Sequence, residues 1–111
     1  MVARAFRRDE VWLVSLDPTQ GAEIRKTRPC LIVSPDEINQ TLDTVIVAPM
    51  TTTIRAYPMR VLLQFQGKRG QIALDQLRTV DQQRLIRKLG TVALGTAQEV
   101  SATLVEMFGR A

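Results

Sequence analysis

Short apolar runs, each ended by turn-forming residues, recur along most of the chain. Several of these runs are four to seven residues long and rich in Val, Ile, Leu and aromatic residues, as β-strands are. The predicted strands cover residues 10–16, 30–34, 44–48, 59–65 and 71–74. Proline, glycine and aspartate between the runs predict turns and loops, including a polar loop over 51–58 and a hairpin turn over 66–70.

The pattern changes to a helical period near the C-terminus. Val100, Leu104 and Met107 recur at helical spacing, and Thr96 with Glu99 has the sequence of a capping box. We therefore predict an amphipathic helix over 96–108, with its apolar stripe buried on the sheet or on another chain.

The remaining connections are predicted to contain further short elements. Residues 36–42 have room for one helical turn, and Asp81 is positioned to cap a short helix that runs to residue 89. The segment 90–95, bounded by glycines, could form a last strand.

Many short strands with helices late in the chain predict a mainly β fold, a small antiparallel, barrel-like sheet with helical additions. The 111 residues predict a single domain, residues 1–111. No apolar run approaches the roughly 20 residues that span a bilayer, and no signal peptide is recognised. We expect a cytoplasmic protein with no membrane segment.

The composition restricts the chemistry. There is no histidine, which excludes a Ser-His-Asp triad and imidazole zinc sites. The single cysteine, Cys30, excludes an intramolecular disulfide and is predicted to be a buried, inert thiol. We expect no metal and no cofactor. The net charge of +4 favours anionic partners such as nucleic acid, although the same balance also serves solubility.

A charged loop before the second predicted strand is the first candidate site. It carries Glu23, Arg25, Lys26 and Arg28, and loops on a rigid scaffold often hold functional residues. The planar guanidinium of arginine donates parallel hydrogen bonds to phosphate. The alternative is a solvated turn in which Arg28 pairs with a nearby carboxylate.

Two further polar clusters follow strand ends. The hydroxyls of Thr51 and Thr52 can bind a phosphate oxygen, or they can form local turns with the backbone. Asp75, Gln76 and Arg78 can read base edges, or they can tie down the end of a strand.

The order of these motifs resembles the MazF/PemK family, the toxin members of bacterial toxin–antitoxin pairs. The resemblance covers nearly the whole chain, and motifs that are modest alone become specific in this order. They are Asp9-Glu10-Val11-Trp12, Asp17-Pro18-Thr19-Gln20-Gly21, Lys26-Thr27-Arg28-Pro29, Ala48-Pro49-Met50-Thr51-Thr52 and Asp75-Gln76-Leu77-Arg78-Thr79.

The resemblance implies a small SH3-like antiparallel barrel of the CcdB/MazF type with a C-terminal helix, assembled as a homodimer. It implies a toxin that inhibits translation and growth by cleaving single-stranded RNA at short sequences without a metal. A cognate antitoxin would cover the dimer and block its site. Two alternatives remain, a gyrase-binding toxin like CcdB and a non-catalytic RNA-binding barrel.

The resemblance also assigns roles to residues. The essential arginine of the family falls on Arg28, the threonine after the third strand on Thr51, the loop glutamate on Glu23 and the later aspartate on Asp75. Some PemK-like members carry an arginine two residues before that aspartate, where this chain has Ala73.

For the reaction, we predict attack by the ribose 2′-hydroxyl on the adjacent phosphate. Arg28 would stabilise the developing charge, Thr51 would orient the phosphate, and Glu23 is the candidate base. The predicted substrate contacts lie around these three residues. They are Gln20, Arg25, Lys26, Thr52, Asp75, Gln76 and Arg78.

Overall fold

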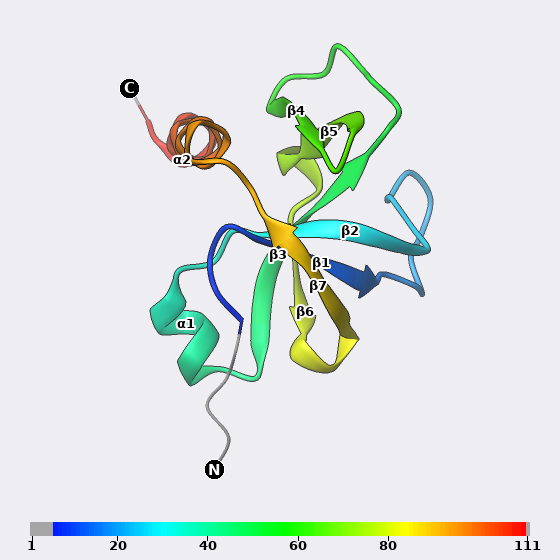
Figure 1. Cartoon of the computed structure of the whole chain (residues 1–111), viewed down its shortest axis with the longest axis vertical. Coiled ribbons are helices and arrows are strands. Elements are labelled where there is room, and N and C mark those ends of the chain that lie inside the picture. Colours follow the sequence, from blue (N-terminus) through cyan, green and yellow to red (C-terminus); the bar gives the residue numbers. More distant parts are fainter. Residues whose placement is uncertain (1–5, 111) are drawn as a thin grey trace.

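The strands form one strongly curled antiparallel sheet, and the two helices lie on the left of the view, one above the other (Figure 1). The computed structural model describes residues 6–110. Within that part of the chain, the strands are β1 Glu10–Ser15, β2 Thr27–Ile32, β3 Thr44–Thr51, β4 Arg60–Phe65, β5 Lys68–Ala73, β6 Arg78–Asp81 and β7 Leu85–Thr91. The helices are α1 Asp36–Thr41 and α2 Leu94–Phe108, with single 3₁₀ turns η1 Leu74–Gln76 and η2 Gln82–Arg84.

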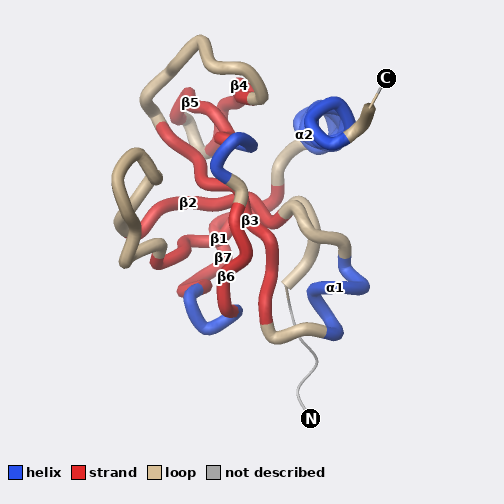
Figure 2. Tube along the Cα trace, turned by 180° about the vertical axis from the view of Figure 1, so that it is seen from behind, coloured by secondary structure: helices blue, strands red, loops and turns tan. Residues whose placement is uncertain are grey.

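Strand β3 joins the two parts of this sheet. Its first part pairs with β6 on one side, and Val47 to Pro49 pair with β2 on the other. Its last two residues, Met50 and Thr51, pair instead with Ile72 and Gln71 of β5. The order of the strands across the sheet is β4-β5-β3-β2-β1-β7, with β6 beside β3, and Figure 2 shows the strands spread around β3. The predicted mainly β, barrel-like fold is therefore confirmed.

The buried apolar side chains form two clusters on opposite faces of the central strands. On β2, Leu31 faces one cluster, whereas Cys30 and Ile32 face the other. On β3, Ala48 faces the same cluster as Leu31, and Val47 faces the same cluster as Cys30 and Ile32. Because successive side chains of a strand point to opposite faces, both faces of β2 and β3 are covered, which explains their nearly continuous apolar sequence.

The C-terminal helix was predicted correctly in type and face but not in its start. Ala97 and Val100 are buried, and Leu104 packs on the cluster that lies under the β4–β5 hairpin. The helix begins at Leu94, and Ala93 is its N-cap without a side-chain hydrogen bond. The predicted capping box is wrong because Thr96 already lies inside the first turn.

The predicted helix over residues 81–89 is also wrong. Asp81 does cap a turn, since its carboxylate accepts a hydrogen bond of 2.8 Å from the backbone N–H of Gln83, but this turn is only η2. The chain then enters β7, which pairs with β1 and leaves Leu85 buried. Pairing with β1 thus overrides the local helical signal. The last strand, predicted over residues 90–95, instead covers Leu85–Thr91, and residues 94 and 95 already belong to α2.

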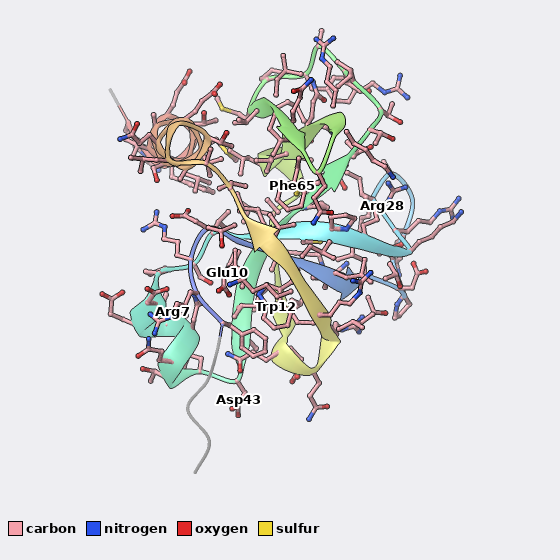
Figure 3. The ribbon with its side chains drawn as sticks, viewed as in Figure 1. Arg7, Glu10, Trp12, Arg28, Asp43 and Phe65 are labelled. Atoms are coloured by element: carbon pink, nitrogen blue, oxygen red, sulfur yellow. The ribbon has the colours of Figure 1, made fainter. Side chains whose placement is uncertain are left out.

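Strand β1 begins with a buried carboxylate, that of Glu10, where β1 pairs with β7. Glu10 accepts hydrogen bonds of 3.0 Å from the indole N–H of Trp12 and from the backbone N–H of Arg7 (Figure 3). Its other carboxylate oxygen lies 2.9 Å from the ammonium nitrogen of Lys88 on β7. Burial raises the pKa of Glu10, but these hydrogen bonds and the charge of Lys88 together outweigh burial and hold the pKa below its ordinary value.

The carboxylate of Glu10 should therefore make the free energy of unfolding depend on pH in the acidic range. A group with a lowered pKa in the folded state stabilises the fold above its ordinary pKa of about 4.5, and that contribution disappears as the pH falls through the folded-state pKa. We expect the free energy of unfolding of the wild type to exceed that of Glu10→Gln at pH 7, with the difference shrinking as the pH falls below about 4.5. Urea unfolding of both proteins across this range measures it. Glu37→Gln, at an exposed position, is the matched control, and a pH-independent difference for Glu10→Gln would contradict the assignment.

A glycine allows β5 to approach the end of β3. A Cβ added at Gly70 would lie 2.6 Å from the backbone oxygen of Thr51.

Among residues 6–110, no helix is long and apolar enough to cross a membrane.

We expect Gly70→Ala to lower the free energy of unfolding by about 1–3 kcal/mol, because the added methyl must push backbone apart. The matched control is Gly95→Ala in α2, where a Cβ meets nothing within 4 Å. Alanine at that helical position should be neutral or should stabilise the protein by up to about 1 kcal/mol. Urea unfolding of the two variants compares them, and equal stability would show that the contact at Gly70 relaxes without strain.

Candidate active site

Arg28 on β2 and Thr51 at the end of β3 line the same cavity. The pairing of β2 with β3 ends at Cys30 and Pro49, two residues from each of them, and Thr51 then pairs with Gln71 of β5. The two side chains line a cavity of about 220 Å³ together with residues of the β4–β5 hairpin, and Figure 3 shows Arg28 and Phe65 on the same side of β2. They also line a neighbouring cavity of about 270 Å³.

The guanidinium of Arg28 has little to bind within the protein. Its Nε donates a hydrogen bond of 2.8 Å to the backbone oxygen of Arg25, which fixes the side chain against the loop. Within residues 6–110, no carboxylate forms an ion pair with it. The predicted alternative, a solvated loop with Arg28 neutralised by a carboxylate, is therefore not observed. The terminal nitrogens of Arg28 are available to an anion in the cavity.

Thr51 takes part in a local turn, and its hydroxyl hydrogen can still donate a hydrogen bond. Its hydroxyl oxygen accepts a hydrogen bond of 3.1 Å from the backbone N–H of Thr53, as the local-turn interpretation expected. That bond uses a lone pair and leaves the hydroxyl hydrogen free to donate. Thr52 is exposed and lines the same 220 Å³ cavity.

Glu23 lies beside this cavity and not in it. Its carboxylate accepts a hydrogen bond from the backbone N–H of Gln20, which closes the tip of the β1–β2 loop. Glu23 lines an adjoining depression of about 400 Å³ with Asp75, Gln76 and Arg78. Gln76 and residues 22 and 24 also line the 270 Å³ cavity that Arg28 and Thr51 share, so the two hollows adjoin.

The β1–β2 loop is fastened to the strand end at Gln76 and Arg78. The side-chain oxygen of Gln76 accepts a hydrogen bond of 2.6 Å from the backbone N–H of Ile24, and Arg78 donates one of 3.1 Å to the backbone oxygen of Leu16. Both residues therefore tie down structure, as the second interpretation of this cluster expected. Arg25 and Lys26 are exposed on the same loop.

Cys30 lies directly below this site, in the buried layer of β2. It is fully buried, and burial raises the pKa of its thiol to about 12 in spite of the nearby positive charges of Arg78 and Arg28. The predicted burial of this thiol is confirmed, and its raised pKa agrees with the predicted low reactivity, because a protonated thiol is a poor nucleophile. Among residues 6–110, no group of three or more acidic or cysteine side chains is placed to hold a metal ion.

Arg60, which binds Asp75, is a site residue that the sequence pattern did not predict. The Nε and one terminal nitrogen of Arg60 donate to the two carboxylate oxygens of Asp75 at 2.6 and 3.1 Å, and the Arg60 side chain is only 5% exposed. Arg60 lines the 270 Å³ cavity and pairs across the β4–β5 ladder with Ala73. A lone arginine at the start of an apolar strand was the available signal.

Comparison with known proteins gives the family. A profile described as a PemK-like, MazF-like toxin of type II toxin–antitoxin systems matches residues 7–108. The chain belongs to this toxin family. Endoribonuclease MazF9 of Mycobacterium tuberculosis is 32% identical over 109 residues, which cover 89% of this chain and 92% of that protein. Endoribonuclease PemK of Escherichia coli is 42% identical over 81 residues, 68% of this chain and 61% of that protein.

A solved structure of an endoribonuclease in complex with its cognate antitoxin, from a mycobacterial species, has the same fold. The TM-score is 0.81 at 25% identity, with 96% of this chain and 98% of that chain covered. The resemblance to the MazF/PemK toxins is therefore confirmed, and so is the fold that it implied. The predicted class, a toxin endoribonuclease of a toxin–antitoxin pair, agrees with the family and with the names of both relatives.

The Arg60–Asp75 pair should stabilise the site of this MazF/PemK-type toxin. Asp75→Asn leaves the buried guanidinium without its counter-charge, so we expect the free energy of unfolding to fall by about 1–3 kcal/mol. The double variant Arg60→Met with Asp75→Asn should lose less than the sum of the two single losses, because it leaves no buried charge unpaired. Urea unfolding of the four proteins measures this cycle, and strictly additive losses would contradict the pairing.

Proposed function

We propose that this chain is a metal-independent endoribonuclease that cleaves single-stranded RNA in the cavity lined by Arg28 and Thr51. The observation that carries the proposal is that these two side chains, from neighbouring strands, line one cavity, with the Arg28 guanidinium free of any carboxylate among the described residues. An arginine anchored through its Nε and without a counter-charge supports a phosphate site, because its fork of N–H groups matches phosphate oxygens.

In the proposed reaction, the ribose 2′-oxygen forms a bond to phosphorus while the bond to the 5′-oxygen breaks. The products are a cyclic phosphate and a 5′-hydroxyl, whose oxygen takes a proton from water as it leaves. Arg28 donates to the phosphate oxygens as negative charge builds on them, and the hydroxyl of Thr51 donates a further hydrogen bond that orients the group. Donors fixed in place before the reaction stabilise such charge without reorganisation.

Glu23 is the proposed base that takes the proton of the 2′-hydroxyl. Its carboxylate is exposed on the loop beside the cavity, and the hollow that it lines adjoins the one that Arg28 and Thr51 share. RNA entering from this side would pass the exposed side chains of the β1–β2 loop first. Gln20, Arg25 and Lys26 are the proposed backbone contacts there, with Thr52 on the opposite rim.

Bases next to the cleaved bond are proposed to reach the depression that Gln76 and Arg78 line. Asp75 contributes through its ion pair, because both of its carboxylate oxygens already bind Arg60.

The proposal extends to partners. The solved mycobacterial relative is bound to its cognate antitoxin. We propose that this toxin likewise binds a cognate antitoxin and acts as a homodimer in the cytoplasm. The exposed apolar side chains Leu94, Val105 and Phe108 on α2, with Leu62 on β4, support a protein-covered surface on this side of the molecule.

The deciding experiment incubates the purified protein with a long mixed-sequence RNA in EDTA and maps the cuts by primer extension. We expect recurrent cleavage at a short sequence, and Arg28→Ala should lower the rate by about 10²–10³-fold, the typical loss of one well-placed donor to developing charge. Arg87→Ala removes the same charge from an exposed position on β7 and should cleave like the wild type.

Three outcomes would contradict this proposal. Wild-type cleavage by folded Arg28→Ala would remove the assigned role of that residue. Saturable binding of RNA without any cut would favour the non-catalytic barrel. RNA that is neither bound nor cut would favour a gyrase-binding toxin.

A further inference from the structure

The β3–β4 loop presents a tyrosine ring to the shared cavity. Tyr57 is 53% exposed and lines the 270 Å³ hollow with Arg28, Thr51 and Arg60. It is the one aromatic side chain among the described residues that line this hollow. A large apolar ring beside a phosphate-type site is what single-stranded nucleic acid requires for stacking.

One face of the Tyr57 ring rests on a guanidinium. The central carbon of Arg60 lies 5.0 Å from the ring centroid, in the range of a cation–π interaction. Arg60 cannot easily move away, because its bidentate pair with Asp75 holds it and its side chain is almost fully buried. The ring is therefore supported from below while it stays half exposed.

The backbone of the same loop is held by Gln71. The side-chain nitrogen of this buried residue donates 2.7 Å to the backbone oxygen of Arg55, and its oxygen accepts 3.1 Å from the backbone N–H of Arg55. That oxygen also lies 3.4 Å from a terminal nitrogen of Arg60. Gln71 thus fixes the loop two residues before Tyr57 and links it to the guanidinium under the ring.

We propose that Tyr57 is a stacking platform for a nucleobase of the RNA strand bound at the Arg28–Thr51 cavity. The inference rests on the proposed function and adds a base subsite to it. Because every base has a π-face, the platform would bind without reading sequence, and base-edge contacts elsewhere would select the cleavage site. A ring already fixed by Arg60 and Gln71 loses little freedom on binding.

The test measures binding separately from cleavage, using single-stranded 2′-deoxy oligonucleotides, which lack the attacking hydroxyl. One probe is a random-sequence pool of about ten nucleotides, and the other is an abasic strand of the same length and charge. Fluorescence anisotropy gives the dissociation constants of the wild type, Tyr57→Ala, Tyr57→Phe and Ile54→Ala. Ile54 is the control position, exposed in the same loop but outside the cavity lining.

We expect Tyr57→Ala to bind the base-containing pool about 5- to 150-fold more weakly than the wild type, the range of one lost base stack. Tyr57→Phe keeps the ring and Ile54→Ala keeps the platform, so both should bind like the wild type. On the abasic strand, the wild type and Tyr57→Ala should be equal.

Unchanged binding of the base-containing pool by Tyr57→Ala would overturn the proposal. An equal loss on both probes would overturn it too, since it would show that Tyr57 only supports the loop. The cleavage assay in EDTA stays independent. A wild type that stacks bases but cuts no RNA refutes the proposed nuclease and keeps the platform, whereas cleavage with binding that ignores Tyr57 refutes the platform alone.

Discussion

The sharing of β3 between two sets of partners is the constraint on which the rest of the molecule depends. Its first part is bonded to β2 and β6, and its last two residues are bonded to β5. This change of partner brings the β4–β5 hairpin over the end of β2. The close approach needs Gly70, whose Cα faces the backbone oxygen of Thr51 without room for a methyl group. Thr51 is therefore held at the point where both parts of the sheet meet.

The polar side chains around this point differ in how far their hydrogen bonds are satisfied. Gln71 and Arg60 are buried and bonded to their neighbours, and among the described residues no buried side-chain nitrogen or oxygen lacks a partner. Arg28 is the contrast, since only its Nε binds within the described chain. A rigid, satisfied network beside one arginine with free donors is the arrangement expected where the protein must bind an anion and keep its shape.

The residues of the proposed site stand on two kinds of support. Arg28 and Thr51 stand on paired strands, whereas Glu23 and the basic residues of the β1–β2 loop stand on a connection closed by its own hydrogen bonds. Loops tolerate change better than paired strands do.

Local signals in the sequence determined where the first five strands lie, which face of α2 is buried, and which chemistries are excluded by the lack of histidine. The order of the motifs determined the family and directed attention to Arg28 and Thr51. These features depend on neighbours along the chain. The tertiary structure alone decided that residues 85–91 extend the sheet from β1 instead of forming a helix, because pairing with β1 outweighed local preference. It alone also decided that Arg60 binds Asp75 under Tyr57, since these contacts arise from the register of β4 on β5 and from the path of a loop, which no local pattern encodes.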